Sequence, residues 1–133
     1  MKNLIAHLVH LVILLTVNSA YGQSSNIIRQ DISPEVFQHK LKHTPHPQLI
    51  DVRTAEEYSE GHIKGALNID VNKPDCISGF SKLNKRQAVF VYCLAGKRGE
   101  KATDILQSLG FREIYNMKGG IQEWINEKKP IEY

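Results

Sequence analysis

The run Ala88-Val89-Phe90-Val91-Tyr92 constrains the fold of this chain more than any other segment. It carries no charge, is rich in β-branched and aromatic side chains, and follows the polar residues 84–87. Such a run is typical of a strand in a parallel sheet that helices cover on both faces. It therefore predicts an interior strand of an α/β domain.

Helix and strand signals alternate along the rest of the chain. Ser33-Pro34-Glu35 is typical of a helix start, and Thr54 with Glu57 has the spacing of a capping box. A helical apolar period begins after Lys97, and Gly110 stands where a left-handed C-terminal residue is expected. Other segments predict strands at 49–52, 67–69 and 113–116, an edge strand beginning at 27–28, and a last helix at 121–128. The alternation predicts one α/β domain with a parallel sheet.

The first 22 residues predict an export signal that is not part of the fold. Lys2 precedes an apolar stretch from Leu4 to Val17, and the small residues Ala20 and Gly22 stand at −3 and −1 of a cut after Gly22. The stretch is shorter than the roughly 20 apolar residues of a spanning helix, which favours cleavage over a retained anchor. We therefore expect a mature domain of residues 23–133, periplasmic or secreted, without stable membrane insertion.

Composition excludes several other classes of protein. The 133 residues carry a net charge of +3, with Lys and Arg spread along the whole chain, so no nucleic-acid partner is expected. Two cysteines are too few for a disulfide-stapled mini-protein or a four-thiolate zinc site. His39, His43 and His46 have no Cys or acid that completes a ligand set, so no metal is expected.

The segment after the Ala88–Tyr92 run carries the chemistry. Cys93 ends the predicted strand, and a helix begins within a few residues, at about Lys97. In an open parallel sheet this edge binds ligands, and backbone N–H groups of such a loop hold an anion or a thiolate, the nucleophilic form of cysteine. Lys97 and Arg98 add positive charge, while Gly96 and Gly99 permit tight turns. The alternative is an inert buried cysteine at a strand end.

Four segments between Leu49 and Trp124 occur as a series. In chain order they are Leu49-Ile50-Asp51-Val52-Arg53 with Glu57-Tyr58, Gly61-His62-Ile63-Lys64-Gly65-Ala66-Leu67-Asn68-Ile69, Tyr92-Cys93-x-x-Gly96-x-Arg98, and Met117-Lys118-Gly119-Gly120-Ile121-x-x-Trp124. In residue type and in order along the chain, these four segments resemble the signatures of the rhodanese family of sulfurtransferases. The resemblance covers most of the predicted mature domain. It implies a three-layer α/β fold with a central parallel five-stranded sheet flanked by helices.

The resemblance also implies a reaction. The Cys93 thiolate takes a sulfane sulfur from a small anionic donor such as thiosulfate and passes it to cyanide or a thiol, by two displacements with a persulfide between them. Arg98 is implied as a catalytic cation, and the residues that would bind the substrate are Leu94, Ala95, Gly96, Lys97 and Gly99. No cofactor is implied, and a redox or sulfur-carrier protein is an expected partner.

Four further residues have structural roles by the same resemblance. Arg53 is expected to pair with a nearby carboxylate such as Glu57, and His62 to bond the backbone. Asp51 lies at the carboxyl end of the strand predicted at 49–52, and it is expected to take no direct part in the chemistry.

One feature of the loop supports sulfur transfer, and another departs from the family pattern. Four residues separate Cys93 from Arg98, whereas protein tyrosine phosphatases have five, so the loop favours sulfur over a tetrahedral oxyanion. The residue after the arginine is usually Ser or Thr in the family, and here it is Gly99. The missing hydroxyl could otherwise bond the sulfur or cap the helix.

Two alternative functions stay open. One is a persulfide-carrying or partner-binding module with little turnover. The other is a thiol–disulfide redox protein that uses Cys76 and Cys93, since disulfides form readily in exported proteins. We interpret Cys76 as a small buried apolar residue.

Overall fold

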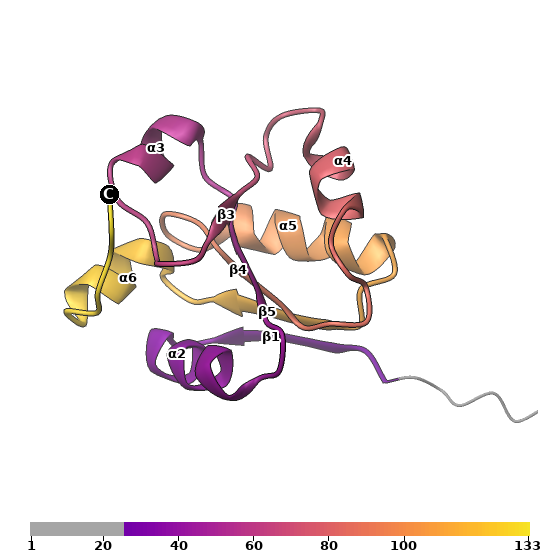
Figure 1. Cartoon of the computed structure of the whole chain (residues 1–133), viewed down its shortest axis with the longest axis horizontal. Helices are drawn as coiled ribbons and strands as arrows, with labels where there is room; N and C mark the ends of the chain where they lie inside the picture. Colours follow the sequence, from indigo (N-terminus) through magenta and orange to yellow (C-terminus); the bar gives the residue numbers. More distant parts are fainter. Residues whose placement is uncertain (1–25) are drawn as a thin grey trace, which may run out of the picture.

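The computed structural model describes residues 26–133, so the predicted export signal lies outside the described residues. Five strands form one parallel sheet in the order β1-β5-β4-β2-β3 (Figure 1). The strands are β1 (Ile28–Ile32), β2 (Gln48–Asp51), β3 (Leu67–Asn68), β4 (Val89–Tyr92) and β5 (Glu113–Met117). The helices are α2 (Pro34–His43), α3 (Ala55–Ser59), α4 (Cys76–Ser81), α5 (Lys97–Ser108) and α6 (Gly120–Asn126). The α/β architecture and five-stranded sheet expected from the sequence are confirmed.

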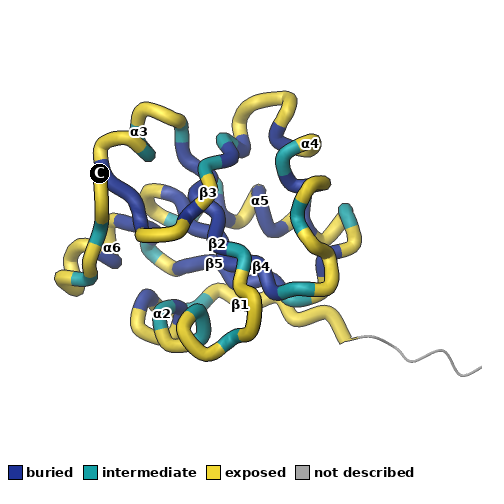
Figure 2. The backbone as a smooth tube through the Cα atoms, viewed as in Figure 1, coloured by how far each residue is buried: buried dark blue, intermediate teal, exposed yellow. Residues whose placement is uncertain are grey.

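The sheet is the middle of three layers. On one face Val89 and Val91 pack against α4 and α5, and on the other Phe90 and Tyr92 pack against α2 and α6. All four residues of β4 are buried, and buried backbone concentrates along the central strands in Figure 2. The interior position predicted for this run follows from having apolar side chains on both faces of the strand.

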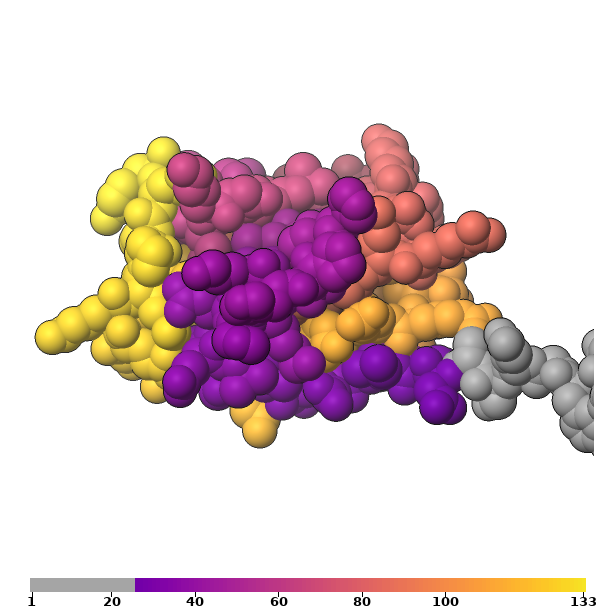
Figure 3. Space-filling model, turned by 60° about the horizontal axis from the view of Figure 1, so that its bottom comes forward, coloured from indigo at the N-terminus to yellow at the C-terminus, as the bar shows by residue number. Residues whose placement is uncertain are grey.

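The segment after α6 lies beside α2 on one face of the sheet. Lys129 Nζ, just after α6, donates to Gln38 Oε1 of α2 at 2.9 Å. Figure 3, which brings this side forward, shows the C-terminal segment beside the N-terminal part of the domain. Within residues 26–133 no helix is long and apolar enough to cross a membrane.

Local end signals are confirmed where the sequence predicted them. Thr54 and Glu57 form both hydrogen bonds of a capping box at the start of α3. After α5, Gly110 adopts φ +96°, while the N–H groups of Gly110 and Phe111 bond the carbonyls of Gln107 and Leu106. This is the glycine-terminated Schellman ending of a helix, and it turns the chain into β5.

Candidate active site

Cys93 lies at the carboxyl end of β4, in the centre of the sheet between β2 and β5. Its residue surface is 1% exposed. The Gly96 N–H donates to Cys93 Sγ at 2.9 Å, and Gly96 takes φ +110°, a conformation that favours glycine. The loop therefore curls back over the sulfur.

Five other N–H groups, in the loop and at the start of α5, have no acceptor among the described residues. Among residues 26–133, no hydrogen-bond partner receives the backbone N–H of Leu94, Ala95, Lys97, Arg98 or Gly99. The last three open α5, a helix of 12 residues, so the helix dipole adds to their donors. A curled loop of free amides at a helix N-terminus is a site for an anion.

The start of α6 holds this loop from the other side. The N–H of Ile121 donates to the Cys93 carbonyl at 2.8 Å, and that of Gln122 to the Leu94 carbonyl at 3.1 Å. A Cβ on Gly120 would lie 2.4 Å from the Cys93 oxygen and from Leu94 backbone atoms. This contact was not predicted from the sequence, although Gly120 is part of a family signature and the Gly119-Gly120 pair was the available signal.

Arg98 is paired with Glu57, a partner that the sequence did not predict for it. Arg98 Nη1 and Nη2 donate to the two carboxylate oxygens of Glu57 at 2.6 and 2.8 Å. The hydrogen bond from Arg98 lowers the pKa of Glu57 to about 2, against a smaller upward effect of burial. The same bond raises the pKa of Arg98, and the nearby Cys93 contributes to that rise. The positive charge of Arg98 is therefore shared with a carboxylate.

Arg53 pairs with a nearby carboxylate, as expected, but the partner is Asp51 and the suggested partner Glu57 is wrong. The two side chains join at 2.7–3.1 Å, and Arg53 Nη2 also donates to the Gly61 carbonyl at 2.7 Å. Burial works to lower the pKa of Arg53, but the bond and charge of Asp51 raise it overall. Arg53 bonds its sequence neighbour because β2 turns directly after Asp51, which leaves Glu57 free for Arg98.

The Asp51–Arg53 pair belongs to a buried framework beside the site. Tyr92 OH accepts the Ile63 N–H at 3.0 Å, and burial followed by the charge of Asp51 raises the pKa of Tyr92. His62 Nδ1 lies 3.0 Å from the Tyr58 carbonyl, the backbone contact expected for it. Among the described residues, Asp51 forms no hydrogen bond with residues 93–99.

The remaining predicted residues lie outside the loop or at its rim. Lys97 is exposed and forms no ion pair among the described residues. Cys76 is 6% exposed, begins α4 and packs in the same core as Val91, as a small apolar residue would. Neither cysteine is in a disulfide. Over residues 26–133 no three His, Cys, Asp or Glu residues come together as a metal site.

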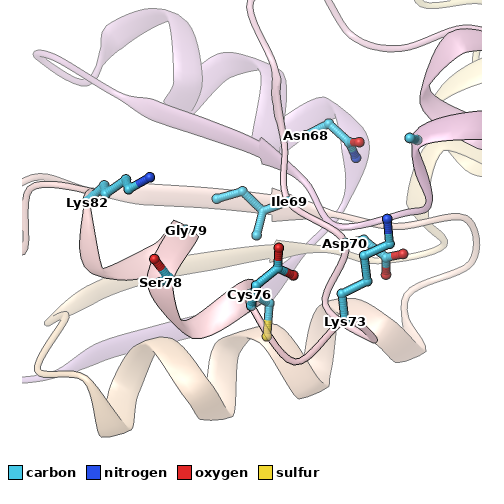
Figure 4. A pocket seen from close by; sticks show the side chains of 10 residues that line it. Asn68, Ile69, Asp70, Lys73, Cys76, Ser78, Gly79 and Lys82 are labelled. Atoms are coloured by element: carbon cyan, nitrogen blue, oxygen red, sulfur yellow. The ribbon is translucent and has the colours of Figure 1, made fainter.

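A pocket of about 290 Å³ lies beside α4 (Figure 4). Asn68, Asp70, Lys73, Cys76 and Lys82 are among its lining residues, and Cys93 is not. In Figure 4 the Cys76 sulfur points toward the helix that packs below it, consistent with its place in the core. The pocket is therefore separate from the curled loop.

The proteins with similar sequences include one named as a sulfur carrier and several named as tRNA uridine(34) hydroxylases. The uncharacterized protein YqhL of Bacillus subtilis is 29% identical over 93% of this chain and 94% of its own length. YrkF of the same organism, whose name proposes a sulfur carrier protein, is 29% identical over 71% of this chain and 50% of its length. The tRNA uridine(34) hydroxylase of Acinetobacter baumannii is 34% identical over 63% of this chain and 28% of its length. This chain thus spans half or less of the last two relatives.

Solved structures share the fold over most of the domain. The rhodanese-like domain of the Anabaena Alr3790 protein superposes with a TM-score of 0.69 at 28% identity, over 77% of each chain. A rhodanese-related protein of Thermoplasma volcanium gives 0.68 at 27% identity, over 77% of this chain and 97% of that one. The family model of the rhodanese-like domain matches residues 33–127. These matches support a sulfurtransferase-like or related enzyme role, and the chain belongs to the rhodanese-like domain family.

Proposed function

We propose that this protein transfers a sulfane sulfur from thiosulfate, or a similar anion, to cyanide or a thiol through a persulfide on Cys93. The observation that carries the proposal is the position of Cys93 Sγ, 2.9 Å from the Gly96 nitrogen inside a loop with five free N–H groups. Such a loop stabilises a thiolate and, after the first step, a persulfide anion.

Both displacements balance without a cofactor. The Cys93 thiolate attacks the outer sulfur of thiosulfate, the S–S bond breaks, and sulfite leaves with the bonding electron pair. Cyanide or an acceptor thiolate then attacks the outer persulfide sulfur, which releases thiocyanate or an acceptor persulfide and restores the Cys93 thiolate. Free loop amides are suited to hold the negative charge in both steps.

A persulfide carrier with little turnover is the second candidate. Its support is the bond between Arg98 and Glu57, which leaves less positive charge for the donor anion, together with the name of the relative YrkF. The redox alternative has less support, since the two cysteines are not joined in a disulfide although both lie in the same apolar core.

Thiosulfate-to-cyanide transfer by the domain without its first 22 residues tests the proposal. Turnover should disappear in Cys93→Ala and persist in Cys76→Ala. Absence of turnover in the fully reduced parent protein would contradict the proposed sulfurtransferase activity. Intact mass then separates the alternatives, because a persulfide adds about 32 Da and a disulfide removes about 2 Da.

We also propose that the protein is exported after cleavage following Gly22. The support is the arrangement of the first 22 residues. Expression of the full chain, followed by fractionation and intact mass, should give an extracytoplasmic product that begins at Gln23. A full-length product in the cytoplasm would contradict it.

A further inference from the structure

The side chain of Asn116 lies behind the sulfur-binding loop and takes no part in the reaction proposed above. Asn116 belongs to β5, pairs in register with Asp31 of β1 and Val91 of β4, and is 2% exposed. Its Nδ2 donates to Asp31 Oδ1 at 2.9 Å and to the Gly96 carbonyl at 3.4 Å. It therefore connects the edge strand to the residue whose N–H bonds Cys93 Sγ.

The oxygen of the same amide is buried without a donor. Asn116 Oδ1 is the one buried side-chain oxygen or nitrogen of the described residues that has no hydrogen-bond partner. Native proteins rarely leave a buried polar atom unpaired, so this atom calls for an explanation.

Gly99 leaves the space that this oxygen occupies. A Cβ at position 99 would lie 2.0 Å from Asn116 Oδ1 and 2.8 Å from its Cγ. Gly99 is in the first turn of α5 without a positive φ, so the backbone does not require glycine there. The requirement is for space, because the Asn116 amide occupies the volume of a side chain at position 99.

We propose that Asn116 is a positioning residue for the sulfur-binding loop, and that Gly99 and Asn116 form a matched pair. The Asn116 amide nitrogen steadies the Gly96 carbonyl, so that the Gly96 N–H stays aimed at Cys93 Sγ. The amide oxygen fills the place where the family pattern has the Ser or Thr side chain. The inference rests on the proposed reactivity of Cys93.

Ultraviolet absorbance of the thiolate against pH tests the positioning role, in a Cys76→Ala background where Cys93 alone reports. Asn116→Ala should raise the midpoint of thiolate formation by about half a pH unit or more, since a hydrogen bond to the charged form is weakened. Asn68→Ala is the matched control. It also loses an amide with two backbone bonds, to the Asp51 and Arg53 carbonyls. It should lower the melting temperature without moving the midpoint.

The matched pair is tested by a second substitution. Gly99→Ser alone should lower the melting temperature and raise the midpoint, because the new Cβ displaces the Asn116 amide. Gly99→Ser combined with Asn116→Ala should recover part of both losses, since the space is then free. An unchanged midpoint in folded Asn116→Ala, or a double variant as impaired as the two single effects combined, would overturn the inference.

The midpoint is measured without sulfur transfer, so the two proposals fail separately. If the parent protein shows no turnover and the midpoints move as expected, the proposed reaction fails and the positioning role stands. If turnover is present and the midpoints do not move, the reverse holds.

Discussion

Arg98 shows how the setting of a single residue decides its chemistry. Its guanidinium lies near Cys93, yet both terminal nitrogens bond the Glu57 carboxylate, and each side chain is about a quarter exposed, at 24% and 26%. A paired arginine restrains the loop geometry and contributes less net charge to a bound anion than a free one. At the residue scale, we therefore expect the Arg98–Glu57 pair to stabilise the fold by joining α5 to α3.

Replacing Glu57 should reveal this stabilisation through the pH dependence of the free energy of unfolding. Because the pKa of Glu57 is lowered from 4.5 to about 2, the pair stabilises the fold above pH 4.5 and loses that effect as pH falls toward 2. Glu57→Gln should lower the free energy of unfolding at pH 7 by about 1–2 kcal/mol, with the gap closing toward pH 2. Urea unfolding at several pH values measures the gap.

Glu56 provides the matched control for that measurement. It lies in the same turn of α3, is exposed and has no ion-pair partner among the described residues. Glu56→Gln should therefore change stability little at any pH. A gap for Glu57→Gln that stays constant from pH 7 to pH 2 would contradict the assignment.

The Asp51–Arg53 pair should be far more costly to break. Both residues are at most 4% exposed, and Asp51→Asn leaves the Arg53 charge buried without its partner. We expect a loss of about 3–5 kcal/mol in the free energy of unfolding. Asp51→Asn with Arg53→Met should recover much of it, and urea unfolding of the three variants decides. A double variant no more stable than Asp51→Asn would contradict a buried-charge penalty.

At the scale of elements, the site is a junction between a strand end and two helix starts. The loop after β4 leads into α5, while the first N–H groups of α6 bond the loop carbonyls of Cys93 and Leu94. These donors would otherwise be unsatisfied helix-end groups, so the contact caps α6 and fixes the loop at once. Close approach of the two backbones is possible because Gly120 has no side chain.

Gly120→Ala should force the start of α6 away from the loop that follows β4. Its Cβ would stand 2.4 Å from backbone atoms of Cys93 and Leu94, which cannot rotate away. We expect the free energy of unfolding to fall by about 3 kcal/mol or more, with loss of sulfur transfer.

Gly65→Ala is the comparison for strain without collision. Gly65 also has a positive φ, +83°, but no atom lies within 4 Å of its Cβ position. Its cost should be limited to about 1–2 kcal/mol of backbone strain. Thermal unfolding and the cyanide assay measure both variants, and equal losses would argue against the close contact.

At the scale of the whole molecule, we expect residues 26–133 to unfold as one cooperative unit, because a single sheet contributes side chains to two cores. Residues of β4 alternate between the α4–α5 core and the α2–α6 core, so neither core persists when the sheet separates. The single tryptophan of the chain, Trp124, lies in the second core.

Leu106→Ala tests this coupling across the sheet. Leu106 is fully buried in the first core, and its truncation should lower the free energy of unfolding by about 3 kcal/mol. Trp124 fluorescence and circular dichroism should shift together in urea, although Trp124 is on the opposite face. Two separate transitions would show that the cores unfold independently.

Many of the helices and strands could be predicted from the sequence because the signals that specify them are local. The apolar run 88–92, the capping box at Thr54 and the glycine after α5 specify elements through periods and end residues a few positions apart. Cys93 was found the same way, since strand, loop and helix start follow one another directly. Local order also places the sulfur at the carboxyl edge of the sheet, because β4 must end there.

The partners across the site were decided by the tertiary structure alone. Arg98 meets Glu57 from 41 positions away, and the Asn116 amide fills the space beside Gly99. Gly120 approaches the Cys93 carbonyl because α6 begins against the loop. Such contacts depend on the strand order β1-β5-β4-β2-β3, which sets the distances between segments and is not encoded in any short spacing. The sequence by itself predicted most of the elements, although not α4, and the cysteine at the strand end. The tertiary structure decided which charge, amide and backbone groups lie around that cysteine.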